Sequence, residues 1–154
     1  MTILNCALNL LSELLFLIDI CIHGSKAKRS YKVARRLEKN EIDTPKPVGY
    51  VEVYGKWHIL KKAYYVSLYL HYDFDMKDVL DKTINCQEKI LTSFAREMAT
   101  VVHPAGAWHN DLSSGNVLIN MLGDDKWSFS FIDLNRLTFR RRISPVKGLA
   151  NFKK

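Results

Sequence analysis

The segment that most constrains the fold is a polar loop at residues 109–116, which reads HNDLSSGN and lies between a predicted helix and a predicted hairpin. The helix is expected at about residues 87–102, because apolar side chains recur there at helical spacing. The hairpin is expected to run from a strand at 117–120, through a Gly-Asp-Asp turn, into a strand at 127–132 whose apolar and polar residues alternate. The apolar face of the helix comprises Ile90, Leu91, Phe94, Met98 and Val101. The hairpin therefore returns the chain to the polar loop, and Asp133 follows its second strand.

Three side chains of this unit suit phosphoryl transfer. Asp111 and Asn116 lie in one loop and can face one site, and the hairpin brings Asp133 beside them. The reaction needs an acidic group to orient the attacking hydroxyl, and carboxylate and amide oxygens to hold magnesium against phosphates. The spacing fits the protein-kinase pattern H-x-D-L-x-x-x-N followed by a metal-binding Asp. On this pattern Asp111 would be the catalytic base, Asn116 and Asp133 would be the magnesium ligands, and His109 would brace the catalytic loop instead of taking part in the chemistry.

The first half of the chain predicts a helix followed by a small sheet. A basic helix is expected at about residues 26–40, with Ser25 as a candidate cap. Its narrow apolar stripe comprises Ala27, Tyr31, Ala34 and Leu37. Residues 43–47 read DTPKP and predict a stiff connector, and β-prone runs at 48–53, 57–60 and 64–70 predict antiparallel strands. A short helix at about 76–81, capped by Asp75, follows. The chain is therefore predicted to be an α+β protein.

The chain resembles the bacterial lipopolysaccharide kinase family, the Kdo/WaaP-type kinases that phosphorylate sugars of the lipid A–core region. The similar segments are SKAKRSYKVARRLEKNEIDTPKPVGYVE, YYVSLYLHYDFDMKDVL, WHNDLSSGNVLI and FSFIDLNRLTF, within residues 25–152. The loop motif alone also fits aminoglycoside phosphotransferases, whereas its combination with IDTPKP and IDLNR is more specific. The resemblance implies ATP as donor, magnesium, a bilobal kinase-like fold and a cytoplasmic site near the inner membrane.

The sequence departs from the kinase pattern at its start. A kinase small lobe begins with a glycine-rich hairpin and a strand lysine that hold the phosphates, but the first glycine here is Gly24 and the first lysine is Lys26. The basic helix has acidic residues only at its far end, Glu38 and Glu41. We therefore expect a partial protein-kinase-like fold, truncated at both ends. The expected divisions are an amphipathic N-terminal helix at 1–23, a small-lobe remnant at 24–70 and a partial large lobe at 71–154.

These departures leave two functional hypotheses. The first is a kinase that transfers phosphate from ATP to a hydroxyl of a lipopolysaccharide core sugar or a similar small acceptor. The alternative is a catalytically impaired pseudokinase, or a truncated fragment, that lacks the glycine-rich loop and its lysine. The Asp133-Leu134-Asn135-Arg136 sequence does not decide between them, because Asn135 and Arg136 suit either a direct role at the site or support of the loop.

Charge and hydropathy limit the partners. The net charge of +7 favours anionic partners, but the basic residues are not interleaved with an aromatic stacking platform, so nucleic acid is not expected. Arg140, Arg141 and Arg142 suit either a solvated surface or an anionic sugar or lipid head group. The apolar N-terminal segment contains Glu13 and Asp19, which favours packing on protein over contact with anionic lipid. We expect a cytoplasmic protein, with peripheral contact at the inner face of the membrane as the open option.

Overall fold

The computed structural model describes residues 24–152. Its helices are α2 (Lys26–Lys39), α3 (Met76–Leu80), α4 (Gln87–Glu97) and α5 (Pro145–Leu149), and its strands are β1 (Pro47–Tyr54), β2 (Leu60–Ser67), β3 (Phe74–Asp75), β4 (Ala107–His109), β5 (Val117–Gly123), β6 (Lys126–Phe131) and β7 (Leu137–Phe139). The predicted helix at 1–23 lies outside the described residues. Within residues 24–152, no helix is long and apolar enough to cross a bilayer.

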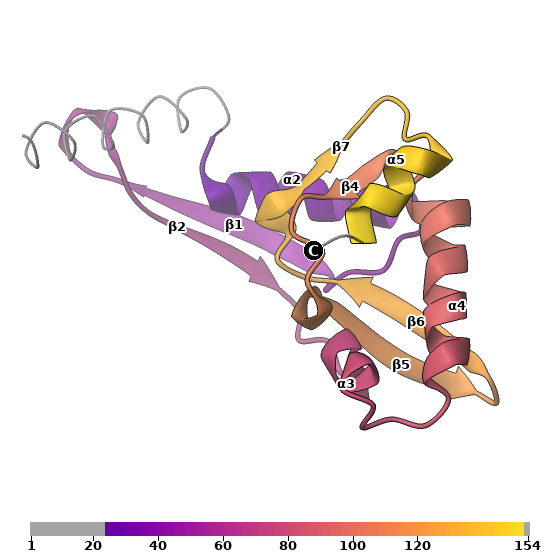
Figure 1. Cartoon of the computed structure of the whole chain (residues 1–154). Helices are drawn as coiled ribbons and strands as arrows, with labels where there is room; N and C mark the ends of the chain where they lie inside the picture. Colours follow the sequence, from indigo (N-terminus) through magenta and orange to yellow (C-terminus); the bar gives the residue numbers. More distant parts are fainter. Residues whose placement is uncertain (1–23, 153–154) are drawn as a thin grey trace, which may run out of the picture.

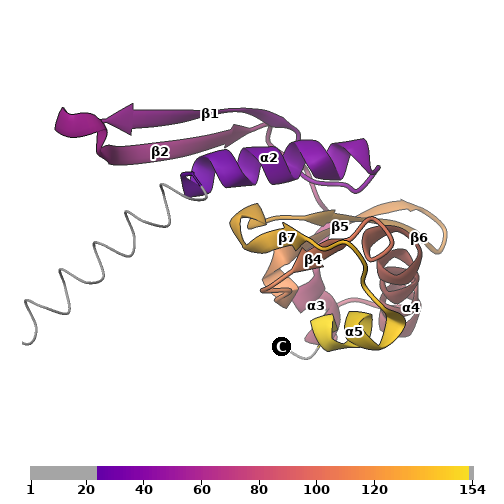
Figure 2. The ribbon, with the colours of Figure 1, turned by 90° about the horizontal axis from the view of Figure 1, so that it is seen from above.

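The helix α2 forms where the basic helix is predicted. Ser25 caps it, because its hydroxyl accepts a hydrogen bond from the backbone N–H of Lys28 at 3.0 Å. Ala34 and Leu37 of its apolar stripe are fully buried. The helix packs against both strands of an antiparallel β1–β2 ribbon and against the 3₁₀ helix Leu134–Arg136. Figures 1 and 2 show α2 running along one face of this ribbon. It therefore lies between the ribbon and the segment that follows Asp133.

The ribbon confirms the predicted antiparallel sheet but corrects its strands. Residues 57–60, predicted as a strand, belong mostly to the turn between β1 and β2, and the second strand is Leu60–Ser67 instead of 64–70. Trp57 and His58 have positive φ angles of 61° and 55°, which end the extended conformation. Their aromatic and apolar neighbours suggested a strand, but Trp57 is 90% exposed. The composition of residues 57–60 thus indicated a strand where the chain forms an exposed turn.

The core lies between α4 and a three-stranded antiparallel sheet with the order β3-β5-β6. Phe94 of α4 packs on Phe129 of β6 with ring centroids 5.1 Å apart. The predicted hairpin is thus confirmed as β5–β6, whereas the two-residue strand β3 and the β4–β7 pair were not predicted. Asp75 caps α3 as expected, since its carboxylate accepts from the backbone N–H of Lys77 and Asp78. The fold is mixed α and β, as predicted.

The long predicted helix changes form near its end. Residues Met98–Val102 form a π-helix after α4, and the N–H of His103 donates to the carbonyl of Met98 at 2.9 Å. A π-turn adds one residue to the helical repeat and therefore shifts the buried face. Val102 is buried at 3% exposure, whereas Val101, assigned to the apolar face by the regular spacing, is 37% exposed.

Candidate functional site

His109 supports the polar loop through hydrogen bonds of its imidazole ring. It is the last residue of β4, which pairs with β7, and only 3% of it is exposed. Its Nδ1 accepts a hydrogen bond from the backbone N–H of Asp111 at 3.2 Å. Its Nε2 must then carry the proton, which it donates to the carbonyl of Ile132 at 3.0 Å. One imidazole therefore joins the loop that contains Asp111 to the strand end that precedes Asp133.

Asn116 joins the same two segments. Its Nδ2 donates to the carbonyl oxygen of Asp111 at 2.9 Å. Its own carbonyl accepts from the N–H of Ile132 at 3.0 Å, directly before Asp133. Because the Nδ2 is used inside the loop, the orientation of the side-chain amide is fixed and its Oδ1 is directed elsewhere. No hydrogen bond within residues 24–152 occupies that Oδ1, so it can serve as a ligand.

The segment after β6 turns sharply at Asp133, which adopts a left-handed conformation with φ of 53°. Asn135 Nδ2 donates to Asp133 Oδ1 at 2.6 Å and fixes this carboxylate. Arg136 reaches back to the loop, with its guanidinium 3.4 Å from Asp111 Oδ2 and its backbone N–H donating to the Asp133 carbonyl at 3.3 Å. Asn135 and Arg136, whose roles the sequence left undecided, thus contact the carboxylates of Asp133 and Asp111, respectively.

A cavity of about 400 Å³ opens beside Asp133. Its walls come from the first two turns of α2, from β2 and from the segment after β6. It is lined by Lys26, Ala27, Ser30, Pro45, Ala63, Tyr65, Ser67, Ile132, Asp133, Leu134 and Asn135, and we call it the Asp133 cavity. The hydroxyl of Tyr65 is buried and has no hydrogen-bond partner among the described residues. Burial also raises the pKa of this phenol. An unpaired buried hydroxyl is costly and suits a site that receives a polar ligand.

The site residues fit a magnesium ion that arrives with phosphates. No group of three or more His, Cys, Asp or Glu side chains able to hold a metal occurs within residues 24–152. Magnesium is commonly bound by one or two protein carboxylates together with substrate phosphates and water. Asp133 and the Oδ1 of Asn116 provide this number and type of ligand. The assignment of Asn116 and Asp133 to Mg²⁺ and ATP, and of Asp111 and His109 to catalysis, remains a prediction.

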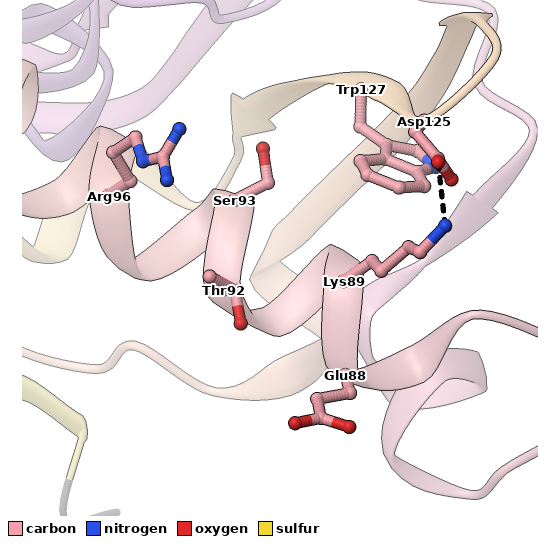
Figure 3. Close-up of a pocket in the computed structure, with 7 residues that line it drawn as sticks. All are labelled: Glu88, Lys89, Thr92, Ser93, Arg96, Asp125 and Trp127. Carbon is pink, nitrogen blue, oxygen red and sulfur yellow. Dashed lines mark hydrogen bonds and ion pairs between the residues drawn. The ribbon is translucent and has the colours of Figure 1, made fainter.

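A second cavity, of about 330 Å³, lies on the outer side of α4. It is lined by Glu88, Lys89, Thr92, Ser93, Arg96, Asp125 and Trp127. Figure 3 shows Lys89 extending to Asp125 at the hairpin turn, and their Nζ and Oδ2 atoms are 2.6 Å apart. Both side chains are more than half exposed, so this ion pair contributes little to stability. None of the four predicted site residues lines this cavity.

Two buried side chains, His103 and Asn151, were not predicted to support the site. Asn151 Nδ2 donates to the carbonyl of His109 at 2.7 Å, and its Oδ1 lies 3.4 Å from His103 Nε2. Burial lowers the pKa of His103, which favours the neutral ring. These contacts join segments more than 40 residues apart. Nothing in the local sequence pattern indicated them.

The basic tail is not only a solvated surface. The guanidinium of Arg140 lies 3.9 Å from the centre of the Trp108 ring, a cation–π contact next to β4. Arg140 also donates its backbone N–H to the carbonyl of Gly106 at 2.8 Å. Arg141 and Arg142 are exposed. Arg140 thus holds the end of β7 in place, and the exposed Arg141 and Arg142 can still contact an anionic group.

Comparison with known proteins identifies the family and the fold of the chain. The model of the lipopolysaccharide kinase (Kdo/WaaP) family matches residues 21–152. Among solved structures, WaaP in complex with acyl carrier protein superposes with a TM-score of 0.59 at 22% identity, covering 81% of this chain and 56% of that one. This likeness shows a shared kinase-like fold, and the chain spans little more than half the length of that solved protein. No curated protein matches the chain. Since the family model covers most of the sequence and the fold agrees with it, the chain belongs to the lipopolysaccharide kinase (Kdo/WaaP) family.

Proposed function

We propose that the chain is a kinase-like phosphotransferase that binds Mg·ATP in the Asp133 cavity. The acceptor would be a hydroxyl of a lipopolysaccharide core sugar or a similar small molecule. The observation that carries the proposal is that hydrogen bonds join the loop containing Asp111 and Asn116 to the strand end before Asp133, and that Asp133 lines the cavity. Hydrogen bonds through His109 and Asn116 hold these two segments together beside a cavity of about 400 Å³. A volume in this range suits a small-molecule ligand.

Each residue has a distinct role in this proposal. Asp111 accepts the proton of the acceptor hydroxyl while the new oxygen–phosphorus bond forms and the bond from the γ-phosphorus to ADP breaks. The neighbouring Arg136 guanidinium keeps the Asp111 carboxylate in place. Asp133 and Asn116 would hold the metal ion, which would neutralise charge on the phosphates. His109 is a positioning residue, because its two hydrogen bonds are used inside the protein.

We also propose that residues 24–70 correspond to a small-lobe remnant and residues 71–154 to a partial large lobe, with residues 1–23 as a separate N-terminal segment. Figure 2 supports the division, because α2, β1 and β2 form one group and the remaining described elements form another. The Asp133 cavity has walls from both groups. This placement is the one expected for a nucleotide between two lobes.

The family relationship also suggests partners and a location. We propose a cytoplasmic site of action at the inner face of the membrane, where lipid-linked sugar acceptors are accessible. WaaP was solved in complex with acyl carrier protein. A binding measurement between this chain and acyl carrier protein tests whether that partnership extends here.

A second candidate function is a catalytically impaired nucleotide-binding protein. The observation that favours it is the small β1–β2 ribbon, because only two strands accompany α2 within the described residues. No glycine-rich hairpin covers the Asp133 cavity in this part of the chain. Loss of such a phosphate-holding element reduces positioning, on which phosphoryl transfer depends.

The proposed activity is tested with radiolabelled ATP, magnesium and a panel of lipid A–core sugars, using the wild type and Asp111→Asn. We expect transfer by the wild type and loss of at least about a hundredfold in the variant, the usual range for a general base. Asp124→Asn, at the exposed hairpin turn, is the matched control and should retain activity. Equal activity of Asp111→Asn and the wild type would contradict the assignment of Asp111. Nucleotide binding without transfer to any acceptor would favour the impaired protein.

A further inference from the structure

The Asp133 cavity has opposite charges on its two walls. Of the residues that line it, Lys26 is the one basic residue and Asp133 is the one acidic residue. Lys26 is the first residue of α2, and Asp133 follows β6 on the other wall. The lysine therefore faces the same space as the proposed metal ligand, although more than 100 residues separate the two in sequence.

Within residues 24–152, no other charged group engages the side chain of Lys26. Its ammonium has no ion pair with a carboxylate of residues 24–152. The first turn of α2 contains no acidic residue, so no neighbouring side chain on the helix neutralises it. Other cations of α2 do have partners, such as Lys28 over the ring of Tyr50 and Arg35 beside Glu38. The charge of Lys26 is thus available to a ligand in the cavity.

No basic residue other than Lys26 lines the cavity, so no second lining cation could contact the phosphates of a nucleotide bound there. Ser30, one turn along α2 from Lys26, is buried and presents a neutral hydroxyl where it lines the cavity. A nucleotide held at Asp133 through magnesium still carries excess negative charge, and kinases place a lysine against it. A lysine ammonium binds phosphate as a point charge on a flexible stem, so it does not need a fixed planar geometry.

We propose that Lys26 binds the nucleotide phosphates in this cavity, the role that a small-lobe strand lysine has in protein kinases. The inference rests on the proposed function, because it requires a nucleotide at Asp133. It goes beyond that function by assigning the phosphate-binding cation to a helix residue.

The test is calorimetric titration of the full chain with Mg·ATP and with adenosine, comparing the wild type, Lys26→Met and Lys32→Met. Lys32 lies on the exposed side of the same helix and does not line the cavity, so it is a matched control for charge. We expect Lys26→Met to weaken Mg·ATP binding by about tenfold or more, the loss typical of a hydrogen bond to a charged group. Adenosine affinity should stay unchanged, and Lys26→Arg should recover part of the Mg·ATP affinity.

The outcomes separate this inference from the proposed function. If the wild type and Lys26→Met bind Mg·ATP equally, Lys26 is not the phosphate ligand, while the nucleotide site stands. If Lys26→Met also weakens adenosine binding to the same degree, the change disturbs the whole cavity and the phosphate role is rejected. If the wild type binds no nucleotide, the proposed function fails and this inference fails with it. A loss confined to Mg·ATP and absent in Lys32→Met supports the assignment.

Discussion

Replacing Glu97 by Gln should stabilise the protein at neutral and alkaline pH. Glu97 is the last residue of α4 and lies partly buried near Asp43. Burial, with a smaller contribution from the charge of Asp43, raises the pKa of the Glu97 carboxyl from 4.5 to about 7. The folded protein therefore holds a proton on Glu97 at pH values where the unfolded chain has lost it.

The sign and size of the effect follow from this difference. Below pH 4.5 the carboxyl is protonated in both states and Glu97 costs nothing. As the pH rises towards 7, the unfolded state is increasingly favoured, and above that pH the full penalty applies. The pKa shift corresponds to at most about 3 kcal/mol. Because solvent reaches part of the side chain, we expect about 1–2 kcal/mol.

The assay is thermal unfolding of the wild type and Glu97→Gln at pH 4.5, 6 and 8. At about 2–4 °C per kcal/mol for a chain of this size, the variant should melt about 2–8 °C higher at pH 8. The difference should shrink as the pH falls. Glu88→Gln, an exposed position on the same helix, is the control and should change little. A shift of equal size at pH 4.5 and pH 8, or no shift at pH 8, would show that the charge of Glu97 does not destabilise the folded protein.

Three further substitutions test the packing around the site. Gly106→Ala should destabilise the protein by about 2 kcal/mol or more, because the φ angle of Gly106 is +79° and a Cβ there would collide with the carbonyl oxygen of Arg140. Urea unfolding measures this loss of stability, and an unchanged unfolding midpoint would contradict the prediction. Phe129→Ala, at a residue 1% exposed in the core, should cost about 3–5 kcal/mol in the same assay, and a loss below 1 kcal/mol would mean that β6 does not pack as described. Asn151→Ala leaves the His109 carbonyl unpaired, so amide exchange in residues 109–116 should accelerate; unchanged exchange would show that Asn151 does not support the loop.

Local patterns predicted much of the fold because the relevant interactions are local. The α2 helix, its Ser25 cap and the β5–β6 hairpin each depend on residues within a few positions of one another. The same holds for Asp75, whose capping hydrogen bonds reach only Lys77 and Asp78. Periodicity and capping chemistry are therefore sufficient to predict them.

The errors arose where the backbone departs from regular repeats. The π-turn at Met98–Val102 moves burial from Val101 to Val102, and the positive φ angles at Trp57 and His58 replace a predicted strand by a turn. Short strands such as β3 carry too few residues to show a period. Sequence spacing alone could not have indicated these features.

The candidate site was partly visible in the sequence. The motif predicted Asp111, Asn116 and Asp133 as neighbours, and the structure brings their segments together through Asn116 and Ile132. The contributions of Lys26 and Asn151 depend on contacts across the whole chain. A motif has fixed spacing within one segment, so it cannot identify residues that reach a site from elsewhere in the fold.

A nucleotide site at Asp133 is tested by a thermal melt of the purified chain with and without magnesium and ATP, beside Asp133→Asn and the control Asp124→Asn. A ligand that binds only the folded state stabilises it by about 2.7 kcal/mol at a hundredfold excess over Kd. We expect a cooperative transition whose midpoint rises when both ligands are present in the wild type and in Asp124→Asn, and stays unchanged in Asp133→Asn. A nucleotide site at Asp133 would be contradicted if Mg·ATP left the melting temperature of the wild type unchanged. It would also be contradicted if Mg·ATP raised the melting temperature of Asp133→Asn as much as that of the wild type.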